Sequence, residues 1–291
     1  MIDKAISLKE RIHHIQKYGL EEKAFTTGFS ALDGFGTKDC LNFRLAKGRF
    51  MVVTGIPNMG KSEVMDAMVL NMAVLHGWKT LFFSPENNPA DEHLVALVEK
   101  YVGKKITKCS RKECDDAVDF INDKISWTCP EDKSIDNLLK IAEEHQLKEG
   151  LDWFIIDPWN YVKNTRGGNM IHEHLSDSLN TVTTFTRNKN VLVTIVAHPS
   201  NLRQDKNGVT QMPDLYTISD GAMWRNKCDY GIVIHRPDMS KDEVEFYVGK
   251  RRKKWMGNIG MTTLDYDKES GRLKGRNDKE FLLPSECEAA F

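Results

Sequence analysis

Residues 55–62 have the types and spacing of a phosphate-binding loop. The segment reads Gly-Ile-Pro-Asn-Met-Gly-Lys-Ser. Its two glycines allow backbone N–H groups to approach phosphate oxygens closely, because no side chain intervenes. Lys61 is expected to contact the β- and γ-phosphates, and the Ser62 hydroxyl to ligate Mg²⁺. The pattern predicts a site for a nucleoside triphosphate; the alternative is a glycine-rich turn with a surface lysine.

Such a loop works when it joins a strand to a helix. The apolar run at residues 50–54 is typical of a buried parallel strand. Apolar residues then recur near helical spacing and predict a helix over residues 63–76. The positive end of that helix dipole would point at the phosphates. The apolar residues of the helix are Val64, Met65, Met68, Met72 and Leu75.

Glu86 follows a second predicted strand, residues 79–84. We expect this strand to lie beside the strand that carries the loop. Ligands of open parallel sheets bind beyond the carboxyl ends of the strands, so Glu86 would lie near the γ-phosphate. A carboxylate there could polarise an attacking water as a general base. The alternative is a solvated surface charge.

Two further apolar strands end in polar residues. Residues 152–156 lead to Asp157, which has the form of a second Mg²⁺ carboxylate acting through water near Ser62. Residues 191–197 lead to His198, which could sense the γ-phosphate or could simply leave the sheet as a polar residue. His172 and His174 do not share a helix face at their spacing and are expected on the surface.

Two basic segments lie later in the chain. The loop at residues 200–217 carries Arg203, Lys206 and Asn207 and lacks apolar periodicity, which is typical of functional or disordered loops. Residues 250–257 form the densest positive run, between strands predicted at 244–248 and 261–266. That run could guard an edge strand, or it could hold a phosphate of a nucleotide or a nucleic acid.

Composition sets the class of protein. The chain has 291 residues, 40% hydrophobic and 29% charged, which suits one large α/β domain with short appendages. A net charge of −1 means that nucleic-acid binding would need a local basic patch. We find no transmembrane segment or signal peptide, and the six cysteines are scattered, which favours a reducing cytosol over disulfide or metal use.

The predicted organisation has three parts. Residues 1–22 form an amphipathic linker helix that docks on its own domain or on a neighbouring subunit. Residues 23–275 form an α/β domain with a mostly parallel central sheet, helices on both faces and a carboxyl-terminal β-hairpin; a short strand is also expected at 125–128. Residues 276–291 form a tail, and the chain from 270 onward has little apolar material and is expected to be loose.

The order of these motifs resembles a known family. The loop at 55–62, Ser-Pro-Glu at 84–86, Ile-Ile-Asp at 155–157, Ala-His at 197–198 and Lys-x-Arg at 250–252 are similar to the RecA-like P-loop domain of DnaB-type replicative helicases. The likeness is strongest to the phage primase-helicase and Twinkle branch and covers about residues 24–275. Since no primase segment precedes the domain in this sequence, priming activity is not expected.

The resemblance implies roles for individual residues. Glu86 would be the catalytic base, Lys61 and Ser62 would bind nucleotide and Mg²⁺, and Asp157 would support the metal. His198 would be the γ-phosphate sensor. Lys250 and Arg252 would enter the nucleotide site of the neighbouring subunit. Arg203, Lys206 and Asn207 would bind DNA in the central channel. The nucleotide-binding set would comprise Gly55, Pro57, Asn58, Gly60, Lys61, Ser62, Glu63, Lys250 and Arg252.

The resemblance also implies an activity. It indicates an ATP-dependent DNA helicase, using ATP or another NTP or dNTP with Mg²⁺, that forms a hexameric ring and moves 5′ to 3′ on single-stranded DNA. A primase and a DNA polymerase would be partners, in the cytoplasm of a bacterial or phage-infected cell. Two alternatives remain: a nucleotide-switched DNA-loading protein that does not unwind, and a RecA-like recombinase that forms filaments.

Overall fold

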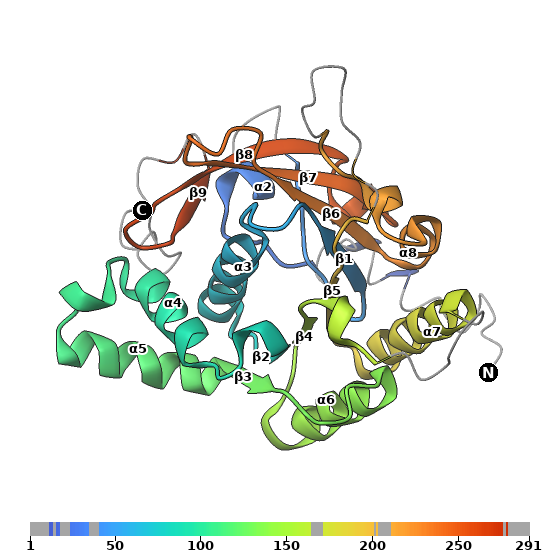
Figure 1. Ribbon diagram of the computed structural model, residues 1–291, viewed down its shortest axis with the longest axis horizontal. Helices are drawn as coiled ribbons and strands as arrows, with labels where there is room; N and C mark the ends of the chain where they lie inside the picture. The colour runs from blue at the N-terminus through green and yellow to red at the C-terminus, as the bar shows by residue number, and fades with distance from the viewer. Residues whose placement is uncertain are drawn as a thin grey trace.

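A mixed β-sheet of nine strands organises the described part of the chain (Figure 1). The computed structural model describes residues 12–13, 16–17, 24–34, 41–163, 171–200, 202, 211–275 and 278, and the side chains of helix α7 from residue 173 onward. The strand order is β3-β2-β4-β5-β1-β6-β7-β8-β9. Strands β1 to β6 pair with one another in parallel. Strand β7 pairs antiparallel with β6, β8 with β7, and β9 with β8.

The parallel part of the sheet is buried on both faces, as its apolar strands require. Every residue of β1, β2, β4, β5 and β6 is buried. The strands are β1 Phe50–Thr54, β2 Thr80–Phe83, β3 Ile125–Thr128, β4 Trp153–Ile156, β5 Leu192–Val196, β6 Tyr230–His235, β7 Glu243–Arg251, β8 Gly260–Tyr266 and β9 Leu273–Gly275.

Helices cover the two faces of the sheet. Figure 1 shows α3, α4 and α5 on one side of the parallel strands and α6, α7 and α8 on the other. The helices are α2 Ser30–Asp33, α3 Lys61–His76, α4 Asp91–Val102, α5 Arg111–Lys124, α6 Ile135–Glu149, α7 Ile171–Lys189 and α8 Gly221–Lys227. The 3₁₀ turns are η3 Pro85–Asn87, η4 Ile106–Lys108, η5 Trp159–Tyr161, η7 Leu215–Thr217 and η8 Lys254–Met256.

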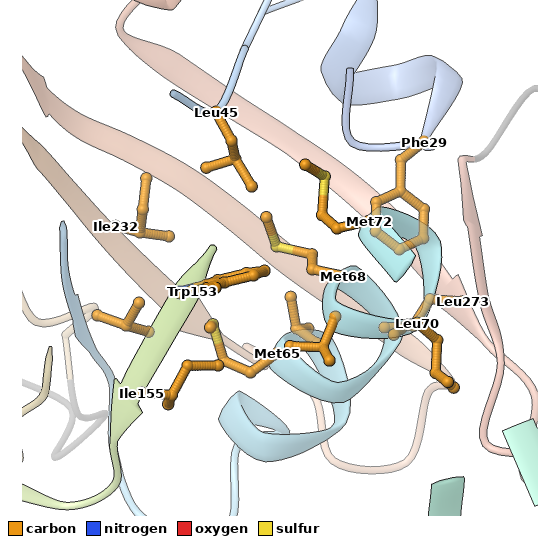
Figure 2. Packing of buried hydrophobic residues seen from close by; sticks show 14 of the residues in the cluster. Phe29, Leu45, Met65, Met68, Leu70, Met72, Trp153, Ile155, Ile232 and Leu273 are labelled. Atoms are coloured by element: carbon orange, nitrogen blue, oxygen red, sulfur yellow. The ribbon is translucent and has the colours of Figure 1, made fainter. Parts of the chain in front are cut away.

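Helix α3 is enclosed by apolar neighbours. Figure 2 shows Met65, Met68 and Met72 of this helix packed toward Trp153 and the other labelled residues of the same cluster. Methionine fills irregular gaps because its unbranched side chain has three rotatable bonds. The helix that begins at the phosphate-binding loop is therefore held firmly against the sheet.

A β-bulge interrupts the pairing of β6 with β7. Gly231 lies opposite Lys250 and Ile232 opposite Val248, so Gly249 has no partner in the ladder. Before the bulge, Val244, Phe246 and Val248 are buried in the core that contains α3. The extra residue turns the following side chains to the opposite face. Lys250 accordingly contacts α8 on the other side of the sheet.

Most predicted strands are confirmed, with three corrections. Residues 273–275 form β9 on the edge of the sheet, with Leu273 buried, so the expectation of a loose chain was wrong for residues 270–275. Helix α7 was not predicted, and His174 within it is buried rather than on the surface. Strand β2, which precedes Glu86, is separated from β1 by β4 and β5 and is not its neighbour.

Two predicted segments lie largely outside the described residues. These are the linker helix at 1–22 and the tail at 276–291, so both remain predictions. Within the part of the chain that the structure describes, no helix combines the length and the apolar composition needed to cross a bilayer.

Candidate functional site

The phosphate-binding loop lies where β1 ends and α3 begins. Asn58 and Gly60 both have positive φ, at 64° and 86°. This conformation turns successive backbone N–H groups toward one concave site, which suits an anion. A Cβ on Gly55 would lie 2.2 Å from the Ile234 carbonyl oxygen of β6, so the loop requires glycine there. The residues present therefore fit a phosphate group.

Lys61 is the buried cation of this loop. Its side-chain Nζ donates to the Gly55 and Ile56 carbonyl oxygens, each at 2.9 Å. Burial lowers the pKa of Lys61, while the charges of Asp157 and Glu86 oppose that shift. A phosphate would favour the charged form of the lysine further. Ser62 is exposed on the first turn of α3, where its hydroxyl is available to a metal ion.

The carboxylates of Asp157 and Glu86 lie close enough to Lys61 for their charges to oppose the lowering of its pKa by burial. Glu86 is exposed on turn η3, directly after β2, and Asp157 follows β4. Burial raises the pKa of Asp157 to about 6, with the charges of Asp66 and Glu86 adding to the effect. The structure thus brings Lys61, Glu86 and Asp157 to one edge of the sheet, although β2 and β1 are not neighbours. A cation at this edge would relieve the repulsion between the carboxylates.

A buried polar chain lies behind this edge and was not found from the sequence. His93 Nε2 lies 2.9 Å from Asp66 Oδ1, and the Trp127 indole N–H donates to His93 Nδ1 at 2.9 Å. The chain joins α3 to α4, the helix that follows Glu86. The available signal was a carboxylate at Asp66 inside an otherwise apolar helix, since such a residue needs a buried partner.

His198 lies just beyond the end of β5. Its Nδ1 atom is buried and has no hydrogen-bond partner among the described residues. Burial lowers the pKa of His198, and nearby Lys61 lowers it further. The neutral imidazole would therefore present a donor or an acceptor to a phosphate without adding charge. A cavity of about 340 Å³, lined in part by Trp159, His174 and Trp224, adjoins it.

The predicted DNA-binding loop starts close to His198. The Ser200 N–H donates to the Thr217 carbonyl oxygen at 2.8 Å, and Pro199 pairs with Ile218, so the two ends of the loop are joined. Residues 203, 206 and 207 lie outside the described residues, and the assignments of Arg203, Lys206 and Asn207 remain predictions.

Lys250 and Arg252 lie at the opposite end of the sheet from the loop. Arg251 pairs with Tyr230, and Tyr230 pairs with Met51 at the amino end of β1. Since the loop follows the carboxyl end of this strand of five residues, roughly 16 Å separates the two ends. Neither side chain is brought to the P-loop of its own chain. Both contact helix α8 instead.

A family model covers nearly all of this structure. The model for the DnaB-like helicase C-terminal domain matches residues 25–275. A Twinkle homolog protein, chloroplastic/mitochondrial, from Arabidopsis thaliana is 34% identical over 278 residues, covering 89% of this chain and 36% of the relative. A probable plasmid replicative DNA helicase from Chlamydia trachomatis serovar L2 is 24% identical over 254 residues, covering 84% and 53%. The chain therefore spans about a third to a half of these relatives.

Two solved structures share the fold. One is a single ATPase domain, with a TM-score of 0.75 at 18% identity, covering 94% of this chain and 99% of that one. The other is a DnaB-like replicative helicase, described with its interactions with primase, with a TM-score of 0.74 at 19% identity, covering 94% and 68%. These matches confirm the predicted RecA-like α/β architecture.

Proposed function

The chain belongs to the family of DnaB-like helicase C-terminal domains, and from this premise we propose that it is a ring-forming DNA helicase driven by nucleoside triphosphate hydrolysis. The observation that carries the proposal is the distribution of charged groups. Lys61, Glu86 and Asp157 share the carboxyl edge of the sheet. Lys250 and Arg252 lie at the amino edge.

ATP or a related NTP or dNTP is the proposed nucleotide. The loop from Gly55 to Ser62 would bind its phosphates, with Pro57, Asn58 and Glu63 completing the set. Ser62 and Asp157 would hold Mg²⁺, which supplies charge neutralisation on the β- and γ-phosphates when bound. Glu86 would accept the proton of the attacking water, and His198 would contact the γ-phosphate. The buried Lys61 supports this proposal because, among the described residues, its Nζ donates to the Gly55 and Ile56 carbonyl oxygens and has no anionic partner at hydrogen-bonding distance.

A ring is proposed because the cations cannot serve their own loop. Arg252 lies at the far end of the sheet, so it can act on a nucleotide when a second copy presents its P-loop there. A planar, always charged guanidinium can contact two phosphate oxygens at once. Hydrolysis would then require two adjoining subunits. We infer a homo-hexamer, the state implied by the likeness to the DnaB family.

The remaining parts of the proposal follow from the family. We propose 5′ to 3′ movement on single-stranded DNA, contacted by Arg203, Lys206 and Asn207. A primase and a DNA polymerase would be partners. One solved relative is described together with its interactions with primase, which supports the first of these. We propose the cytoplasm of a bacterial or phage-infected cell as the place of action.

One paired measurement tests this function. ATPase activity is measured with and without single-stranded DNA, and the mass of the oligomer is measured in the same buffers. We expect a ring, hydrolysis that the DNA stimulates, and no hydrolysis by Lys61→Ala. A filament that grows along DNA would indicate a recombinase instead. A ring that binds DNA with no turnover would indicate a nucleotide-switched loading protein.

A further inference from the structure

Arg252 makes a dense set of contacts within its own chain. Its Nε atom lies 2.6 Å from Oδ1 of Asp229. Its Nη2 atom donates to the carbonyl oxygens of Asn226, Lys227 and Cys228 at 3.0, 2.9 and 3.1 Å. These carbonyls lie at the end of helix α8, where the helix leaves acceptors unpaired. In this position Nε and Nη2 of the guanidinium are held by groups of their own chain, so Arg252 must leave these contacts to bind two phosphate oxygens of a neighbouring subunit with this edge.

The contact with Asp229 is the one that opposes movement of Arg252 away from its own chain. Its side chain is 0% exposed, and its Oδ2 atom accepts the Phe50 N–H at 3.1 Å. The carbonyls of α8 lie at a partly exposed helix end, so water can replace the arginine there. Water cannot reach the Asp229 carboxylate in this way. A buried carboxylate that loses its cation is strongly unfavourable, so Arg252 needs a replacement.

Arg187 is placed to be that replacement. Its Nη2 atom lies 4.0 Å from Oδ1 of Asp229, the same oxygen that Arg252 contacts. Its side chain is 50% exposed at the end of α7, so it can rotate without disturbing the core. Two cations therefore face one buried anion, one engaged and one close by.

We propose that Asp229 holds Arg252 in a resting position and that Arg187 takes its place when Arg252 moves to the nucleotide of a neighbouring subunit. This inference rests on the proposed function, in which Arg252 acts between subunits. Arg187 and Asp229 are positioning residues and do not touch the nucleotide. The exchange keeps Asp229 paired throughout, so release of Arg252 costs little at an interface where a phosphate competes for it.

A double-mutant cycle on the assembled ring tests the exchange. The steady-state ATPase kcat and KM are measured with single-stranded DNA for Arg187→Gln, Asp229→Asn and the double variant. Arg187→Gln should lower kcat about fivefold or more with KM unchanged, because Arg252 is then retained. In the Asp229→Asn background, which needs no cation, Arg187→Gln should have no effect. An equal loss in both backgrounds, or no loss in either, overturns the proposal.

Controls separate the exchange from folding and from the proposed function. Arg187→Lys keeps a cation and should retain the parent kcat, and Arg111→Gln removes an exposed arginine on α5 that should not matter. If Asp229→Asn fails to fold, the pair Arg187→Gln and Arg187→Lys decides, since equal kcat values for both overturn the proposal. Arg252→Ala tests the proposed function separately: an active Arg252→Ala variant refutes its role between subunits, whereas an inactive one leaves the exchange to be judged by Arg187.

Discussion

At the scale of single residues, Glu86 gives the sharpest test of the chemistry. Glu86 is exposed after β2, and its charge opposes the lowering of the Lys61 pKa by burial and adds to the rise of the Asp157 pKa that burial causes. Glu86→Gln keeps the shape and removes the base. Nucleotide affinity should stay near the parent value while hydrolysis falls by about two to four orders of magnitude. Glu92→Gln, an exposed glutamate six positions later, is the matched control; comparable turnover in both variants would make Glu86 a surface carboxylate.

His235 gives a prediction about acid stability. Burial lowers the pKa of this histidine, and its Nδ1 atom is buried with no partner among the described residues. The folded state therefore binds fewer protons than the unfolded state near the ordinary histidine pKa. Stability should fall as the pH drops through that range, because the fold resists protonation of His235.

Replacing the histidine should weaken this dependence. Between pH 8 and pH 5, urea unfolding should show a smaller loss of stability for His235→Gln than for the parent chain. The comparison uses each protein's own value at pH 8 as its reference, so any constant effect of the substitution cancels. Identical losses in the two proteins would exclude His235 as a contributor.

At the scale of elements, the junction of the loop with β6 depends on Gly55. A Cβ at this position would collide with the Ile234 carbonyl oxygen at 2.2 Å, and backbone atoms cannot move aside cheaply. Gly55→Ala should cost about 1–3 kcal/mol of unfolding free energy and lower nucleotide affinity. Gly77→Ala is the control, since Gly77 also has a positive φ but its added Cβ meets nothing within 4 Å.

The Gly77→Ala control separates the cost of a steric collision from the cost of a positive φ. Gly77→Ala should lose about 1 kcal/mol, the ordinary cost of a positive φ, and should bind nucleotide normally. Calorimetric melts and a fluorescent nucleotide titration measure both quantities. If Gly55→Ala binds nucleotide as tightly as Gly77→Ala, the loop does not need its close approach to β6.

Elements were predictable from the sequence where the pattern was local. The strand at 125–128 and the loop between β1 and α3 were placed correctly because apolar runs and glycine spacing are visible residue by residue. Helix α7 was missed because Thr181, Thr183 and Thr184 break its apolar pattern with residues of low helix propensity. Its own buried face, with Leu179 and Val182, packs against the sheet and overrides that propensity.

The order of strands and the polar partners were not predictable. Which strand lies beside β1 is decided by crossover connections, and β5 rather than β2 takes that place. Likewise, no spacing rule links Asp66 to His93 or Asp229 to Arg252, because these pairs form between distant elements. The residues of the candidate site could be picked out from motifs, whereas the contacts that position them could be seen only in the fold.

At the scale of the whole molecule, the positions of Glu86 and Arg252 at opposite ends of the sheet predict that each hydrolysis site uses residues from two subunits. Arg252→Ala and Glu86→Gln should each hydrolyse poorly as pure rings. Mixed rings contain interfaces with an intact Glu86 on one side and an intact Arg252 on the other. Mixing should therefore restore part of the activity, to about a quarter of the parent rate at equal proportions if each such interface works alone.

The mixing experiment needs proof that rings have mixed. Native mass measurement of subunits that carry different tags supplies it. Restored activity in confirmed mixed rings supports an arginine supplied by the neighbour. Confirmed mixed rings that remain inactive would show that Arg252 does not act across the interface and would favour a DNA contact for the hairpin.

The bulge at Gly249 has a consequence for how this chain can change in length. The segment from Val244 to Arg252 contains two alternating registers of opposite parity, joined at one unpaired glycine. Deleting that glycine would leave a regular ladder, because Val248 stays opposite Ile232 and Lys250 stays opposite Gly231, so Lys250 keeps the face on which it contacts α8. A variant that lacks Gly249 alone should therefore fold with Val248 still in the apolar core and Lys250 still beside α8, which a crystal structure of the variant would show.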